Sequence, residues 1–125
     1  MIEVSVYKKG DEAELEISGH AGFNPGNDIV CAAASMLGQT FVQALLDMEY
    51  QRELCTVSTE HLDKGKLLAY GKANGTVSAI RLEAVAKTII TGFRMLAERF
   101  PDHVELKERA SPKCEKRGGE KEFEG

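Results

Sequence analysis

The spacing of apolar residues changes along this chain in a fixed order, and that order limits the fold more than any other feature. In residues 2–7 and 13–17 every second residue is apolar, which is the period of a β-strand. The polar turn residues between these two runs predict a β-hairpin. From Ile29 apolar residues recur at three and four positions, so we expect a helix that ends at about Asp47 or Tyr50.

The same order repeats in the second half of the chain. Runs rich in strand-forming residues at 54–59 and 66–73 predict a second hairpin. Helical spacing then returns and ends before Pro101, and Thr76 or Ser78 is the expected N-cap of this second helix.

Val104 and Leu106 indicate a short last strand, which completes the order β-β-α-β-β-α-β. Without its first strand this order is that of ferredoxin-like two-layer folds. We therefore expect an α+β fold in which two helices pack on an antiparallel-rich sheet, a ferredoxin-like plan with an extra N-terminal strand.

A chain of 125 residues is long enough for one domain with a modest core and too short for two. We assign residues 1–107 to this single domain. Residues 108–125 are mostly charged or small, with Phe123 as their only large apolar residue, so we expect a disordered tail.

Composition excludes several classes of function. The net charge of −4 and the absence of tryptophan argue against direct nucleic-acid binding. We expect neither a membrane span nor a signal peptide, which predicts a cytoplasmic protein. The three cysteines, Cys31, Cys55 and Cys114, are widely spaced and predict free thiols, with no metal site and no cofactor.

One cysteine and one histidine lie where they could form a nucleophilic pair. With Asp28 as N-cap, Cys31 falls in the first turn of the first helix, where unpaired backbone N–H groups favour a thiolate. An ordinary thiol needs about 2 kcal/mol to ionise near neutral pH, and a helix dipole supplies about 0.3–1 kcal/mol. A protonated His20, at the end of the second strand, would supply the remainder.

Neighbouring residues have alternative roles in such a site. Ser35 lies one turn after Cys31 and either donates to the sulfur or to a substrate carbonyl, or bonds back to the Cys31 carbonyl. Asp28 either caps the helix or pairs with His20, and the backbone N–H groups of Cys31 and Ala32 are candidate oxyanion donors.

The segment 21–28, with Gly22 and Gly26, is an expected mobile loop that closes over an extended peptide. In the simpler interpretation, Cys31 is a buried small hydrophobic residue and His20 bonds to the backbone.

These residues resemble a specific motif. The matching positions are Gly19-His20-Ala21, Gly26, Asp28-Ile29-Val30-Cys31-Ala32-Ala33 and Ser35. They resemble the ribosomal-processing cysteine protease family, Prp, over a stretch from the first strand to about Leu106. The resemblance implies a homodimeric bacterial enzyme that removes a short N-terminal extension from a large-subunit ribosomal protein, with His20 and Cys31 as the catalytic pair. It places Asp28 and Ser35 at the other polar positions of the motif.

Two features depart from the family pattern. The loop around Pro25 is shorter than expected, and the charged tail is longer. The family also resembles phage-borne enzymes that trim structural proteins, so a phage protein is a second possible substrate. Our hypothesis is a cysteine endopeptidase. The alternatives are a non-catalytic ribosome-assembly or peptide-binding module, and a folded metal site that uses His20 and Cys31.

Overall fold

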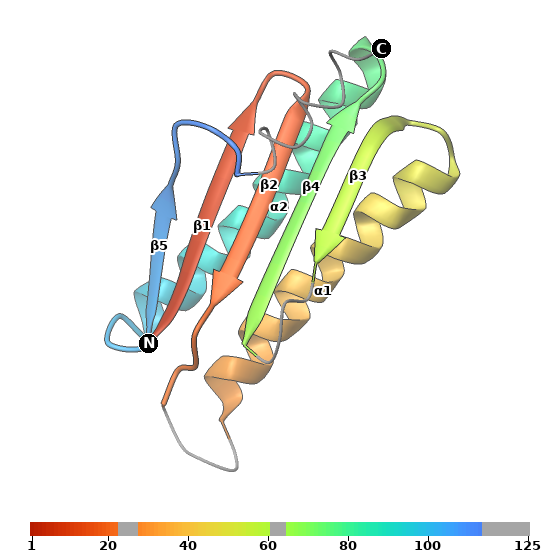
Figure 1. Cartoon of the computed structure of the whole chain (residues 1–125). Helices are drawn as coiled ribbons and strands as arrows, with labels where there is room; N and C mark the ends of the chain where they lie inside the picture. The colour runs from red at the N-terminus through yellow and green to blue at the C-terminus, as the bar shows by residue number, and fades with distance from the viewer. Residues whose placement is uncertain (23–27, 61–64, 114–125) are drawn as a thin grey trace.

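The computed structural model describes residues 1–22, 28–60 and 65–113, and its elements follow the predicted order. The strands and helices are β1 (Ile2–Lys9), β2 (Glu12–Ser18), α1 (Ile29–Tyr50), β3 (Leu54–Glu60), β4 (Lys66–Ala73), α2 (Thr76–Arg99) and β5 (Val104–Glu108). The predicted α+β class is confirmed, with both helices on one face of a single sheet (Figure 1).

The sheet has the strand order β3-β4-β2-β1-β5. Three neighbouring pairs are antiparallel and the pair β1–β5 is parallel, which makes the sheet antiparallel-rich as expected. The extra N-terminal strand β1 lies inside the sheet, between β2 and β5, where both of its edges are hydrogen-bonded. This arrangement brings the start of β1, the end of β2 and the start of β4 to one end of the sheet (Figure 1).

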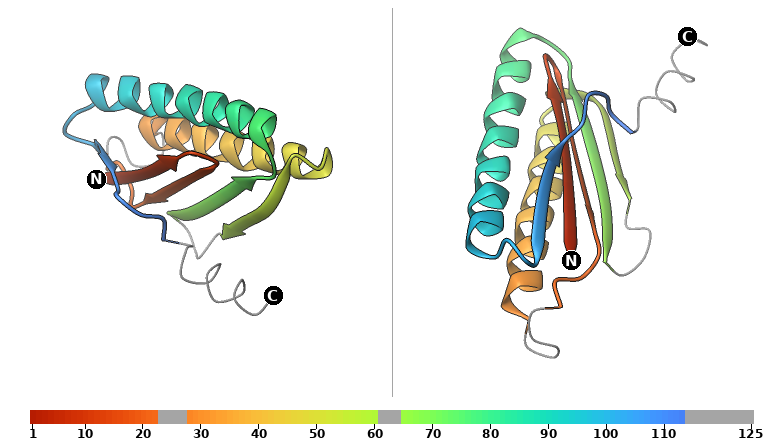
Figure 2. Two further views of the ribbon diagram at one scale, coloured as in Figure 1. Left: turned by 90° about the horizontal axis from the view of Figure 1, so that it is seen from above. Right: turned by 90° about the vertical axis from the view of Figure 1, so that its left-hand side faces the viewer.

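The core lies between this sheet and the two helices (Figure 2). Alternate strand residues such as Val4, Leu15 and Ala69 face the helices, which contribute Phe41 and Phe93. α1 approaches the sheet closely at Gly38, because a methyl group there would lie only 2.7 Å from Ile17 Cδ1. The glycine thus places the first half of α1 directly against the end of β2.

By length and composition alone, α1 could cross a membrane. Its apolar residues include a side that packs on the sheet, with Val30, Phe41 and Leu45 almost fully buried. The apolar composition of this helix is therefore explained in part by its place in the core.

The two helices begin in different ways. Asp28 caps α1 as predicted, since its Oδ1 accepts hydrogen bonds from the backbone N–H groups of Val30 and Cys31, both at 3.0 Å. The predicted caps of α2 are wrong. Gly75 is its N-cap and has no side chain, while the Ser78 hydroxyl donates to Asn74 Oδ1 at 2.9 Å from within the first turn.

The segment after β5 lies against the sheet face that is turned away from the helices (Figure 2). Glu108 is the last residue of β5, so the predicted start of the tail falls inside a strand. We call residues 109–113 the C-terminal strap. In it, Arg109 Nη2 and the Lys113 backbone N–H both contact Glu14 Oε1 at 2.6 Å. Residues 114–125, the rest of the predicted disordered tail, lie outside the described residues.

Candidate active site

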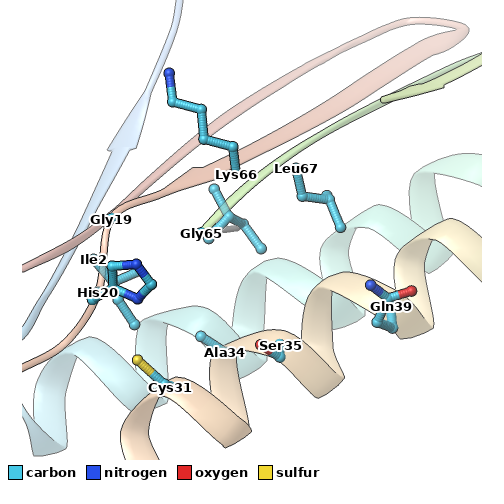
Figure 3. A pocket seen from close by; sticks show the side chains of 11 residues that line it. Ile2, Gly19, His20, Cys31, Ala34, Ser35, Gln39, Gly65, Lys66 and Leu67 are labelled. Atoms are coloured by element: carbon cyan, nitrogen blue, oxygen red, sulfur yellow. The ribbon is translucent and has the colours of Figure 1, made fainter. Parts of the chain in front are cut away.

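A cavity of about 420 Å³ lies at the end of the sheet where β2 stops and β4 starts, and α1 forms its other wall. Both members of the predicted pair, His20 and Cys31, line it (Figure 3). Ser35 lies one turn further along the same wall. The fold thus brings together the three side chains that the sequence singled out for chemistry.

Cys31 is half-buried in the first turn of α1. Its sulfur points to the side of the cavity where His20 lies (Figure 3). The backbone N–H of Ala21 donates a hydrogen bond to Cys31 Sγ at 3.2 Å. This hydrogen bond ties the sulfur to the segment after β2 and fixes the sulfur at the wall of the cavity.

His20 is exposed at the rim of the cavity, two residues after the end of β2. Its ring packs against the turn before β4, since a methyl group on Gly65 would lie 3.0 Å from His20 Nε2. The Gly19 N–H donates to the Gly65 carbonyl at 2.9 Å and joins the backbone of the two segments. The position of His20 therefore depends on a turn that is 45 residues away in sequence.

The Ala32 N–H, which the sequence predicts as an oxyanion donor, is hydrogen-bonded within the helix in this structure. It is already the first donor of the helix ladder, to the Asp28 carbonyl at 3.1 Å, and the Cys31 N–H is bound by the Asp28 side chain. The Asp28 cap and the helix geometry satisfy these groups before any substrate arrives. The backbone donor to the Cys31 sulfur is the Ala21 N–H, which belongs to the segment after β2.

The other predicted site residues are Ser35, Gly22 and Gly26, and the structure describes the first two. Ser35 is exposed to the cavity, and within the described residues its hydroxyl has no hydrogen bond, including none to the Cys31 carbonyl. Gly22 has a positive φ of 67°, and no atom of the described residues lies within 4 Å of the position that a methyl group would take there. Gly26 and most of the expected mobile loop lie outside the described residues.

Cys55 lies outside the lining of this cavity. Cys55 is exposed on β3, where its thiol lies 3.6 Å from the carbonyls of Lys72 and Ala73. Cys114 lies outside the described residues. Across residues 1–22, 28–60 and 65–113, no group of three or more His, Cys, Asp or Glu side chains could hold a metal ion.

One residue near the site was not predicted. His103, in the turn before β5, has its ring Nδ1 2.9 Å from the Ala21 carbonyl oxygen. Nothing in the local sequence signals this contact, because the two residues are 82 positions apart.

Comparisons with known proteins agree with the geometry. The model of a family described as cysteine protease Prp matches residues 1–105. No curated protein sequence matches this chain significantly.

Solved structures share the fold. A ribosomal processing protease Prp from Staphylococcus aureus, in complex with a covalently linked product peptide, is 20% identical with a TM-score of 0.65 and matches 87% of this chain and 100% of its own. SMU.848 from Streptococcus mutans is 29% identical with a TM-score of 0.65, over 86% of this chain and 93% of that one. The likeness to both covers almost the whole length of those proteins.

Proposed function

Because this chain belongs to the Prp family of cysteine proteases, we propose that Cys31 and His20 are its catalytic pair and that its substrate is the N-terminal extension of a large-subunit ribosomal protein. The main observation behind this proposal is the hydrogen bond from the Ala21 N–H to the Cys31 sulfur, in a cavity that His20 also lines. A thiol held in this way, with an imidazole at the same cavity, suits acyl transfer.

The reaction would proceed in two steps. The Cys31 thiolate attacks the carbonyl carbon of the scissile peptide bond, and His20 protonates the leaving amine, so that an acyl-enzyme remains. Water then attacks the thioester with His20 as the general base. This step releases the new carboxylic acid product and restores the Cys31 thiolate and the protonated His20.

Ser35 is our candidate for holding the substrate carbonyl oxygen. Its exposed hydroxyl lies one turn from Cys31 on the same cavity wall. The N–H groups of Cys31 and Ala32 are engaged within the helix start, which leaves the Ser35 hydroxyl as the side-chain donor placed beside the sulfur on α1.

The nature of the substrate is supported by the cavity and by the related proteins. Ile2, Ile17 and Leu67 give the cavity an apolar lining that suits an apolar side chain of an extended peptide. The similar Staphylococcus aureus protein is described as a ribosomal processing protease with a linked product peptide. A phage structural protein is the alternative substrate, and both would be bound as extended peptides.

Selective alkylation tests the nucleophile. A limiting thiol reagent at about pH 6, where ordinary thiols are mostly protonated, should modify Cys31 faster than Cys55 or Cys114. Peptide mapping by mass spectrometry identifies the modified residue. Equal, slow modification of all three cysteines would contradict activation of Cys31.

Cleavage tests the reaction itself. A peptide with the sequence of the ribosomal extension should be cut by the wild type and by Cys55→Ser, and not by Cys31→Ala or His20→Ala. If Cys31→Ser binds the peptide normally and the wild type never cleaves it, the chain is a non-catalytic peptide-binding or ribosome-assembly module.

We also propose that the protein acts as a cytoplasmic homodimer that pairs through the outer face of α1. This face, which we call the outer stripe, consists of exposed residues with the spacing of a coiled-coil seam and without a charge: Ile29, Ala32, Met36, Gln39, Gln43, Leu46 and Tyr50. Its apolar members lie toward both ends and its glutamines near the middle. Antiparallel pairing with a second copy therefore matches apolar with apolar residues and glutamine with glutamine.

Light scattering coupled to size exclusion tests this assembly. The wild type should be a dimer at micromolar concentration, and Met36→Lys should be a monomer, because it places a charge among the apolar residues of the stripe. Met95→Lys is the control, since Met95 is a similarly exposed methionine on α2, at 48% against 66% for Met36. A monomeric wild type, or a Met36→Lys variant that stays dimeric, would refute the interface.

A further inference from the structure

We infer that His103 is a positioning residue for the catalytic pair, and that it acts through the backbone of Ala21. This inference rests on the proposed function, because it assigns a supporting role in the same site. His103 lies in the turn between α2 and β5, outside the cavity lining, and it is not part of the motif that surrounds Cys31.

The contact is a hydrogen bond between the His103 ring and the main chain. His103 Nδ1 lies 2.9 Å from the Ala21 carbonyl oxygen, at a partly buried position. A carbonyl oxygen only accepts, so Nδ1 carries the proton and donates it. The contact therefore defines which ring nitrogen is protonated in neutral His103.

Ala21 is the residue through which this contact reaches the nucleophile. Its N–H donates to Cys31 Sγ at 3.2 Å, its carbonyl accepts from His103, and its side chain is 4% exposed within the core. These three attachments fix the orientation of both peptide groups at Ala21. His20 directly precedes Ala21, so the same attachments limit where the imidazole can lie.

His103 is itself held firmly. Its N–H donates to the Phe100 carbonyl at 2.9 Å, and its carbonyl accepts from the Ile2 N–H at 2.8 Å. These bonds join the backbone of His103 to the end of α2 and to the start of β1. The His103 ring is thus attached to the backbone of the α2–β5 turn, and it restrains Ala21. Ala21 directly precedes Gly22, a residue with positive φ.

Loss of the ring donor would release the Ala21 carbonyl and leave the backbone around Ala21 free to shift, including the preceding His20–Ala21 peptide group that carries the Ala21 N–H. The Ala21 N–H would then spend less time directed at the Cys31 sulfur, and the thiolate would lose a charge-assisted hydrogen bond. Binding of the remainder of the peptide substrate would change little, since His103 does not line the cavity. The expected effect is on the reactivity of the nucleophile, and so on kcat more than on KM.

Three variants of the full chain test this role. His103→Ala should lower the rate of Cys31 alkylation and kcat at least tenfold with little change in KM. His103→Asn keeps a donor near the position of Nδ1 and should recover most of both rates. Val104→Ala removes a buried side chain next in sequence, which is 2% exposed, and keeps the His103 ring donor; it should lower the melting temperature and leave both rates near wild type.

Several results would overturn the inference. The first is a Cys31 alkylation rate in His103→Ala equal to that of the wild type. The second is a loss of alkylation rate and kcat in His103→Asn as large as in His103→Ala. The third is an equal loss of both rates in Val104→Ala, which would indicate a general effect of destabilisation. Alkylation requires no substrate, so it separates this role from the proposed function. If the wild type alkylates rapidly yet cleaves no peptide, the substrate assignment fails while the His103 comparison still stands.

Discussion

Asp28 stabilises the start of α1 through one carboxylate oxygen, which accepts from two backbone N–H groups at 3.0 Å. Replacing it with alanine removes this cap next to Cys31. We expect Asp28→Ala to lose about 1 kcal/mol of stability, and Asp28→Asn to lose much less because its amide oxygen can still accept. Thermal unfolding measures the difference, and equal melting temperatures for the two variants would contradict the capping role.

Tyr70 is the residue whose ionisation the fold opposes most clearly. It lies on the sheet face away from the helices, where burial, and then the charge of nearby Glu12, raise its pKa above the ordinary value of 10.0. The unfolded chain releases this proton near pH 10 while the folded protein retains it. The contribution of Tyr70 to the free energy of unfolding is therefore complete below that pH and falls as the pH rises above it.

The pH dependence of unfolding tests this assignment. Above pH 10 the wild type should lose stability more steeply than Tyr70→Phe, by about 1.4 kcal/mol per pH unit. Tyr50→Phe is the matched control, because Tyr50 is 88% exposed. Denaturant titrations at several alkaline pH values measure the slopes. Parallel curves for the wild type and Tyr70→Phe would show that burial of Tyr70 does not hold its proton.

At the scale of elements, the turn before β4 controls the position of His20. Gly65 has a φ of +81°, and a methyl group there would lie 3.0 Å from His20 Nε2. Gly65→Ala should therefore displace the imidazole and lower kcat roughly tenfold or more, because small displacements of a catalytic group slow the reaction sharply. Steady-state cleavage of the peptide measures this effect.

Gly10→Ala is the control for backbone strain. Gly10 also has a positive φ, of +58°, and within the part of the chain that the structure describes no atom lies within 4 Å of the place a methyl group would occupy. Both substitutions should cost about 1 kcal/mol of stability, and only Gly65→Ala should lose activity. Equal kcat values for the two variants would show that the turn does not position His20.

At the scale of the whole molecule, the C-terminal strap binds to β2, the central strand of the sheet. The Glu14 side chain is fully buried, and Arg109 Nη2 and the Lys113 N–H both contact its Oε1. Deleting residues 109–125 removes these two partners from a buried carboxylate, so we expect a loss of about 3 kcal/mol in the free energy of unfolding. Deleting only 114–125 keeps both partners and should change stability little.

Denaturant titration compares the two truncated proteins. The family match ends at residue 105, so the strap is a feature beyond that match. Its attachment to the face opposite the helices places it away from the cavity, and cleavage by folded protein should survive both deletions. Equal midpoints for the two truncations would mean that the strap contributes no stability.

The local order of the fold could be predicted because it depends on short-range patterns. Alternation at Ile2, Val4 and Val6 and helical spacing from Ile29 reflect which side of each element must be buried. Asp28 was identified as a cap for a similar reason, since its acceptor reaches N–H groups two and three residues away. The N-cap of α2 was missed because Gly75 caps without any side-chain signal.

The sequence by itself determined the seven elements, the fold class and the Cys31–His20 pair, because periodicity, capping and the motif are all carried by neighbouring residues. Only the tertiary structure decided that β1 lies between β2 and β5, that Gly65 packs on His20, and that Ala21 links His103 to the sulfur. Those contacts join residues far apart in the chain, and they form only when the sheet brings their elements to one end. The proposed pair of Cys31 and His20 can thus be identified from local sequence, whereas the backbone donor that contacts the sulfur depends on the assembled fold.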